Sequence, residues 1–457
     1  MKYTFILCAL FAGVFTVAAS AFADNDQLDF RVSPERDRVF KSDNAEVVFD
    51  INLHGRKGVS TLGRHVPINL ALVLDHSGSM EGPKIEKARQ AACIAIDQLE
   101  PTDTYSLVQF DDQVDVLVPA QPVENKERLK EIVNRIEPGG STALYAGVQE
   151  GAHQLRKYFD AKNVNRVILV SDGIANVGPS SPEEIAGLGR TLRDQDSPVT
   201  TVGLGDDYNE DVMASLAEAS GANYYYVRDA EKLPEVFEEE LGQVKSEVAQ
   251  DVKIIIEMPE GVAPIEIVGM PDVHFEGNKA TISLGAFYAA ENRDILVRCR
   301  VKAPQGGSEE VGHVHIVYAA PGDGKDRESD LDARVKFTDQ QADADKSVNA
   351  DVETKAALAE NSVARQRALA MQDAGDLRGA AQVLKDQAKA DASAAAAFPS
   401  SGLSSGGASL SSKLRSEADS LGGIAGQLDS ATPLGNAQRK AFQYENYNQA
   451  NQKDEQQ

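Results

Sequence analysis

Positive charge is scarce in this sequence of 457 residues. Its 46 Lys and Arg residues face 71 Asp and Glu residues, which leaves a formal net charge of −25 at pH 7. A polyanion of this kind is repelled by the phosphates of nucleic acids and by anionic lipid surfaces. The charge balance therefore disfavours both as partners and favours an interaction with cations. By itself, it is equally typical of any soluble exported protein.

Cysteine is also rare, with three residues in the whole chain, one of which, Cys8, lies in the N-terminal apolar run. Cys93 falls in a helical segment rich in Ala and Ile, and Cys299 lies on a strand face with other apolar residues. Both resemble small buried hydrophobic residues of separate domains, and a disulfide between them is the less favoured alternative. The length suffices for two or three domains, each with its own core.

Long apolar runs are missing after residue 23, so no membrane-spanning helix is predicted. Residues 1–23 themselves have the pattern of a signal peptide. Lys2 precedes an apolar run over 5–19, and Ala21-Phe22-Ala23 matches an A-x-A cleavage site. Cleavage after Ala23 predicts a periplasmic or secreted protein.

Catalytic motifs are missing as well. The sequence has neither H-E-x-x-H nor the phosphate loop G-x-x-x-x-G-K-[ST]. G-x-S-x-G occurs at 402–406, but in a low-complexity stretch without the strand-to-helix turn that exposes a nucleophile. We therefore expect no catalytic residues and no enzyme.

What the sequence does contain is an alternation of strand-like and helix-like segments from Val66 to about Lys245. Ile68–Leu74 is a continuous apolar run, as in a strand covered on both faces, and a helix with one apolar stripe follows it. Repeated units of this kind predict a mostly parallel sheet with helices on both faces. The expected fold class is therefore α/β, an open doubly wound domain.

The regions on either side of this α/β segment show a different pattern. Short strand-like runs at Asn44–His54 and over Asp251–Tyr318 are together sufficient for one β-sandwich, into which the α/β domain would be inserted. Two helices at 352–372 and 377–390 then predict a helical hairpin, and the Ala, Ser and Gly of 392–412 predict a flexible linker. The expected boundaries are a signal peptide at 1–23, sandwich at 24–65, α/β domain at 66–246, sandwich at 247–338, helical hairpin at 339–391, and linker with a weakly helical, flexible tail at 392–457.

Oxygen-bearing side chains follow the predicted strands of the α/β domain. Asp75, Ser77 and Ser79 form D-x-S-x-S after the first strand, Thr142 precedes a helix, and Asp172 ends a later strand. Ligands of open α/β sheets bind beyond the carboxyl ends of strands, so three loops should converge there on a solvent-facing crest. Mg²⁺ prefers about six hard oxygen ligands and keeps several waters. Two carboxylates and three neutral hydroxyls would leave such a cation electrophilic, with an open position for a partner's Asp or Glu.

In this order the five residues reproduce the adhesion-site motif of von Willebrand factor type A domains, and the similarity covers about 66–245. The segment Gly203–Asn209 is similar to bacterial secreted members related to inter-alpha-trypsin inhibitor heavy chains. The resemblance implies a Rossmann-like sheet, a bound Mg²⁺ with Mn²⁺ or Ca²⁺ as alternatives, and binding of a protein or matrix ligand whose acidic residue completes the coordination. Integrin-type domains with a second cation site place further acids after the motif. Here only Glu81 does so, which puts a second site in doubt.

Some other polar residues have two readings, and the alternatives stay open. The pairs Asp111-Asp112 and Asp206-Asp207 are either turn residues or ligand contacts, and the first interpretation is favoured. His313 and His315 share a strand face, where a solvated surface is favoured over a transition-metal site. The alternative to metal-dependent adhesion is an envelope assembly or stress scaffold that acts mainly through the helical C-terminal region.

The signal-peptide pattern generates the first prediction. Mass spectrometry of the protein purified from its host should find Asp24 at the mature N-terminus, because the A-x-A site ends at Ala23. Recovery of chains that still begin with Met1 from a cytosolic fraction would contradict the predicted export.

Overall fold

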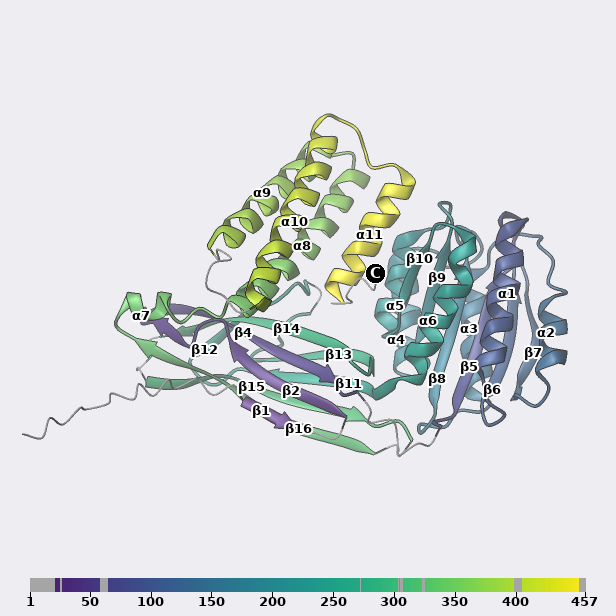
Figure 1. Ribbon diagram of the computed structural model, residues 1–457, viewed down its shortest axis with the longest axis horizontal. Helices are drawn as coiled ribbons and strands as arrows, with labels where there is room; N and C mark the ends of the chain where they lie inside the picture. The colour runs from purple at the N-terminus through teal and green to yellow at the C-terminus, as the bar shows by residue number, and fades with distance from the viewer. Residues whose placement is uncertain are drawn as a thin grey trace, which may run out of the picture.

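The computed structural model describes residues 21–24, 27–57, 65–271, 273–302, 304, 307–322, 325–397 and 405–451. An α/β domain lies beside a β-sandwich, and a helical bundle packs against both (Figure 1). Residues 1–20 of the predicted signal peptide lie outside the described residues. Strand β1 (Ala21–Asp24) pairs antiparallel with β2 (Leu28–Pro34), so cleavage after Ala23 would leave only Asp24 of this strand.

The α/β domain is built on one six-stranded sheet with the order β10-β9-β8-β5-β6-β7. Neighbouring strands are parallel except at one edge, where β7 runs antiparallel to β6. The strands are β5 (Ile68–Asp75), β6 (Thr104–Phe110), β7 (Val114–Pro122), β8 (Val164–Ser171), β9 (Val199–Leu204) and β10 (Tyr224–Val227). Every residue of β5 and β8 is buried, because helices cover both faces of the sheet.

Helices α1, α2 and α6 pack on one face of this sheet, and α3, α4 and α5 pack on the other, each set around its own apolar core. Their bounds are α1 (Pro83–Gln98), α2 (Lys126–Val133), α3 (Leu144–Arg156), α4 (Pro182–Arg193), α5 (Glu210–Ser220) and α6 (Leu233–Lys245). Local signals set the ends of the helices: Ser181 and Glu184 form a capping box on α4, Asn209 caps α5, and Gly221 in the left-handed conformation ends α5. The predicted doubly wound, Rossmann-like fold is confirmed.

The sandwich combines strands from both sides of the α/β domain. One sheet has the order β1-β2-β4-β14-β12, and the other has the order β13-β11-β15-β16-β3. The remaining strands are β3 (Arg38–Phe40), β4 (Asn44–Gly55), β11 (Glu247–Glu257), β12 (Val262–Val268), β13 (Lys279–Tyr288), β14 (Asn292–Lys302), β15 (Gly307–Ala319) and β16 (Asp326–Thr338). Strand β4 pairs antiparallel with β14, from Asn44 opposite Lys302 to His54 opposite Asn292. The α/β domain is therefore inserted into the sandwich, as the sequence predicts.

Both described cysteines are free thiols. Cys299 is buried in the apolar core between the two sandwich sheets, as expected, whereas Cys93 on α1 is half-buried. No helix among the described residues is both long and apolar enough to cross a membrane.

The C-terminal region is more ordered than the sequence predicts. After the short α7 (Gln341–Asp345), the four helices α8 (Ala350–Asp373), α9 (Leu377–Ala397), α10 (Ser405–Asp429) and α11 (Asn436–Ala450) form one bundle. Leu414, Leu421 and Leu428 of α10 are all buried at a seven-residue spacing that the surrounding Ser and Gly obscure. The prediction of a linker and a flexible, weakly helical tail over 392–457 is therefore wrong for the described residues up to Asn451.

Helix α11 fixes this bundle to the α/β domain. The ammonium of Lys440, which is buried, donates a hydrogen bond to the carbonyl oxygen of Tyr208 (2.6 Å) and also contacts the carboxylate of Glu210. Arg439 pairs with Asp211 (2.8 Å), and the hydroxyl of Tyr447 donates to the carbonyl of Ala222 (2.7 Å). Helix α11 thus packs against α5 and against the segments on both sides of it.

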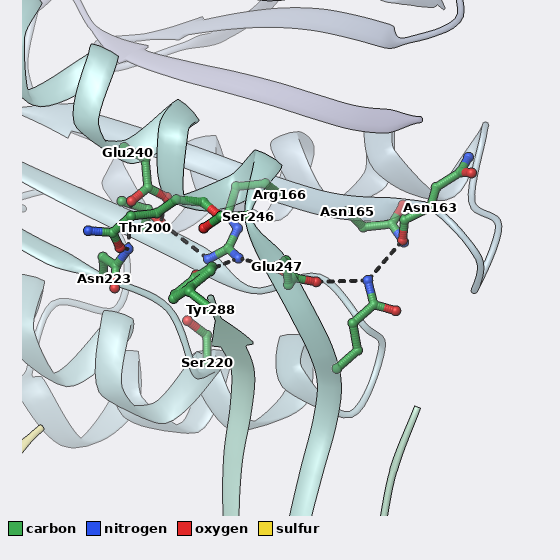
Figure 2. Close-up of polar contacts among 12 residues, drawn as sticks. Asn163, Asn165, Arg166, Thr200, Ser220, Asn223, Glu240, Ser246, Glu247 and Tyr288 are labelled. Atoms are coloured by element: carbon green, nitrogen blue, oxygen red, sulfur yellow. Dashed lines mark hydrogen bonds and ion pairs between the residues drawn. The ribbon is translucent and has the colours of Figure 1, made fainter. Parts of the chain in front are cut away.

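A fully buried arginine joins the α/β domain to the sandwich, as Figure 2 shows. Arg166 of β8 donates from Nη2 to the Glu247 carboxylate (3.0 Å) and to the Tyr288 hydroxyl (2.8 Å), which belong to β11 and β13. Its Nη1 donates to Thr200 of β9 (3.4 Å). Burial raises the pKa of Glu247, and the Arg166 guanidinium opposes that shift. The pair is stable only as long as both charges are present.

The second prediction concerns the variant Arg166→Met. It should lower the free energy of unfolding by about 3–5 kcal/mol, because Glu247 would stay buried without its counter-charge. Calorimetry should also resolve separate transitions for the α/β domain and the sandwich. Arg190→Met, at an exposed arginine of α4, is the matched control and should change the unfolding free energy by less than about 0.5 kcal/mol. Equal stability of the two variants would refute the role of Arg166 as the link.

Candidate metal centre

Three loops meet at the carboxyl ends of β5 and β8. Asp75 is the last residue of β5, Asp172 directly follows β8, and Thr142 lies just before α3. The turn after β5 enters a short 3₁₀ helix (η2, Gly78–Met80) and is fastened to the Thr142 loop by backbone hydrogen bonds. Gly78 N–H donates to the carbonyl of Gly140 (3.2 Å), and Gly139 N–H donates to that of His76 (2.7 Å).

A chain of hydrogen bonds links four of the five predicted residues. Ser77 N–H donates to Asp75 Oδ1 (2.8 Å), the Ser77 and Ser79 hydroxyls lie 3.1 Å apart, and Ser79 Oγ donates to Asp172 Oδ1 (2.7 Å). The fifth residue, Thr142, adjoins this cluster at Gly173. A Cβ atom at Gly173 would lie 2.7 Å from Thr142 Oγ1 and 3.4 Å from Asp75 Oδ2. The Thr142 hydroxyl therefore borders the same small space, which only a glycine at 173 leaves open.

The two carboxylates of this cluster are fully buried. Asp75 and Asp172 are both 0% exposed, whereas Ser79 is exposed at the rim. The expectation that these carboxylates face solvent is therefore wrong, since the loops close over both. Burial raises the pKa of Asp75 to about 6, against hydrogen bonds from Ser171 and Ser77 that lower it. An ionised carboxylate in such a place requires donors or a cation.

Lys84 provides one positive charge at this centre. From the first turn of α1 its ammonium donates to Asp172 Oδ2 at 2.5 Å, so Oδ1 faces Ser79 and Oδ2 faces the lysine. Neither this residue nor Ser171, whose hydroxyl donates to Asp75 Oδ2, is part of the predicted motif. Their closeness to the motif is the signal that could have indicated them, because Lys84 lies five residues after Ser79 and Ser171 adjoins Asp172.

The donor set fits a hard divalent cation. Carboxylate and hydroxyl oxygens are ligands that Mg²⁺ accepts, and two acids with one paired lysine leave the cluster weakly negative. No group of three or more His, Cys, Asp or Glu side chains suited to a metal occurs in the described parts of the chain. A cation at this centre would therefore depend on the serine and threonine hydroxyls.

The remaining polar candidates fall into two groups. Asp111 and Asp112 lie at the crest against Gly140, and Asp111 Oδ1 accepts from the backbone of Gln113 (2.8 Å) as a turn residue does. The histidine pair is far from the centre, in β15 of the sandwich, where His313 pairs with Asp332 at 3.0 Å and also with Asp330.

Asp206 and His315 also have structural partners. The Asp206 carboxylate accepts a hydrogen bond from the Tyr226 hydroxyl (2.6 Å), and Asp207 is exposed beside it. His315 lies 2.9 Å from Asp330, and both histidines are partly exposed, which is consistent with the favoured interpretation of a solvated face.

A doubly wound sheet that carries D-x-S-x-S, Thr and Asp on three loops at its crest defines the class of the domain. Residues 69–239 match the sequence model of the von Willebrand factor type A domain. The chain therefore contains a von Willebrand factor type A domain, and the resemblance inferred from the motif is confirmed. Domains of this class commonly bind proteins, which supports a protein-interaction or adhesion-type function in general terms.

Two relatives illustrate the similarity in sequence. An uncharacterized protein of Synechocystis is 26% identical over 338 residues, which span 71% of this chain and 79% of that protein. Human inter-alpha-trypsin inhibitor heavy chain H3 is 30% identical over 161 residues, or 33% of this chain. That match spans 18% of heavy chain H3, so it concerns the domain alone.

Two solved structures share the architecture beyond this domain. The von Willebrand factor type A protein from Catenulispora acidiphila has a TM-score of 0.65 at 19% identity and covers 89% of this chain and 98% of its own. The ArnB paralog VWA2 from Sulfolobus acidocaldarius has a TM-score of 0.55 at 15% identity and covers 90% of this chain and 100% of its own. At these identities the likeness shows the fold.

Proposed function

We propose that the crest of the von Willebrand factor type A domain binds Mg²⁺, with Mn²⁺ or Ca²⁺ as alternative ions, and captures an acidic side chain of a protein or matrix ligand outside the cytoplasm. The ligands are Asp75, Ser77, Ser79, Thr142 and Asp172. The observation that carries the proposal is the convergence of two fully buried carboxylates and three hydroxyls from separate loops.

The charges of the centre favour capture of an anion. Two carboxylates and the ammonium of Lys84 sum to −1, because −2 and +1 are combined. When bound, a divalent cation supplies two positive charges and brings the centre to +1. The hydroxyls of Ser77 and Ser79 supply neutral oxygen ligands, so they add no negative charge to the centre. Asp172 orients Ser79 by accepting its hydrogen bond. A partner's carboxylate is then attracted to the bound cation.

We further propose that the protein acts by binding and not by catalysis. The hydroxyl of Ser77 bonds to another serine hydroxyl and has no histidine or lysine base beside it in the described structure. His76, the nearest histidine in sequence, directs Nδ1 to the backbone carbonyl of Glu137 (3.0 Å). These contacts favour a site for a ligand over an activated nucleophile.

Metal-dependent stabilisation is the third prediction. If Mg²⁺ binds only the folded state, a concentration a hundred times its dissociation constant should stabilise the domain by about 2.7 kcal/mol. The melting temperature should then rise by roughly 5 to 10 °C. Asp172→Asn and Asp75→Asn should remove most of this rise because each deletes a ligand charge while preserving side-chain volume in a buried place. Ser77→Ala should remove less of it.

Differential scanning calorimetry with Mg²⁺ and with EDTA measures this shift. Glu124→Gln, at an exposed acid that follows β7 at the end of the sheet opposite the crest, is the matched control and should keep the full rise. Equal melting temperatures in Mg²⁺ and EDTA for the unaltered protein would mean that the cluster does not bind the ion.

Gly173→Ala is the fourth prediction. The added methyl group would collide with the Thr142 hydroxyl, so Mg²⁺ affinity should fall roughly tenfold, about 1.4 kcal/mol. Isothermal titration calorimetry with Mg²⁺ measures the change. Gly139→Ala lies in the Thr142 loop, where a Cβ atom meets no other atom within 4 Å, and should leave the affinity unchanged. Loss of affinity in both variants alike would contradict the specific role of Gly173.

A further inference from the structure

The two sides of the crest differ in chemistry. Strand β5, which ends at Asp75, lies between β8 and β6 in the sheet, so the loop after β8 and the turn after β6 flank the metal centre on opposite sides. The loop after β8 presents Ile174 and Val177 to solvent, with 59% and 39% of their surface exposed. They are two of the six large hydrophobic side chains that are exposed among the described residues.

This apolar side is held in a defined conformation. Thr142 N–H donates to Asn176 Oδ1 (2.9 Å), and the N–H groups of Asn176 and Val177 donate back to the Thr142 carbonyl at 3.2 and 3.4 Å. Ala175, between the two exposed residues, is buried and anchors the loop. Ile174 and Val177 are thus fixed outward beside a proposed metal ligand, so a partner could cover them with little further ordering of the loop.

The opposite side is acidic. The carboxylates of Asp111 and Asp112 both lie against Gly140, where a Cβ atom would collide with them. Nε2 of His76 is buried, points to Asp111 Oδ2 at 3.8 Å, and has no hydrogen-bond partner among the described residues. A partner's carboxylate that reaches the centre would meet these two negative charges unless a positive group accompanies it.

We propose that the ligand is a protein segment whose acidic residue is flanked by an aliphatic or aromatic residue, which covers Ile174 and Val177, and by a Lys or Arg, which faces Asp111 and Asp112. The inference rests on the proposed metal-dependent capture and adds the chemistry that selects the partner. The net charge of −25 acts in the same direction, because it steers basic segments toward the protein.

Selection from a random peptide library displayed on phage tests the inference. The full chain is immobilised, and binding peptides are recovered in Mg²⁺ and, separately, in EDTA. The unaltered protein should enrich, only in Mg²⁺, peptides in which Asp or Glu has an apolar residue on one side and Lys or Arg on the other. The double variant Ile174→Ser, Val177→Ser should lose the apolar preference, and Asp112→Asn should weaken the basic one.

Affinity measurements on one enriched synthetic peptide complete the test. The double variant should bind it roughly tenfold more weakly, while its melting shift in Mg²⁺ stays equal to that of the unaltered protein. Mg²⁺-dependent enrichment of acidic peptides with random neighbours would overturn this inference and leave the metal-dependent capture standing. No Mg²⁺-dependent enrichment of acidic peptides would overturn both. Because the unaltered protein alone reveals the preference, the result does not depend on the folding of any variant.

Discussion

Burial of negative charge at the ends of the two central strands is the constraint on which the crest depends. Strands β5 and β8 are covered on both faces, and the carboxylates of Asp75 and Asp172 at their ends have no exposed surface. An ionised carboxylate loses its hydration there and needs donors or positive charge in return. Ser77, Ser171, Ser79 and Lys84 provide them, which explains why hydroxyl residues and one lysine gather around two acids.

Strand β8 carries a second buried charge toward its other end. Arg166 lies near the start of β8 and pairs with Glu247 of the sandwich (Figure 2). Asp172 follows the last residue of β8. One short, fully buried strand therefore connects the sandwich to the crest. Helix α11 adds a further fixed contact, because Lys440 holds the loop between β9 and α5. Crest, sandwich and bundle are thus linked by buried polar contacts as well as by apolar packing.

The architecture could be predicted largely because its signals are local and periodic. The continuous apolar run Ile68–Leu74 indicates a strand covered on both faces, and the strand-like runs on both sides of the α/β domain indicate one interrupted sandwich. The motif order also indicates where all five proposed ligands lie, at and after the carboxyl ends of β5 and β8 and just before α3.

Other features depend on contacts between residues far apart in sequence. Arg166 lies in a mostly apolar strand, but its partner Glu247 is 81 residues away. The burial of Asp172 follows from how the loops close over it, which composition does not reveal. In α10 the Ser and Gly content indicated a flexible chain, whereas the buried Leu414, Leu421 and Leu428 show that a sparse heptad suffices once α8 and α9 supply the other side of the core.

Anomalous diffraction from crystals of the full chain grown in Mn²⁺ can locate a divalent cation at the crest. The proposed function predicts an anomalous peak within coordination distance, about 2.0–2.4 Å, of oxygens from Ser77, Ser79 and Thr142, with Asp75 and Asp172 bound directly or through water. A peak elsewhere on the protein with none at the crest, or no peak at saturating Mn²⁺, would contradict it.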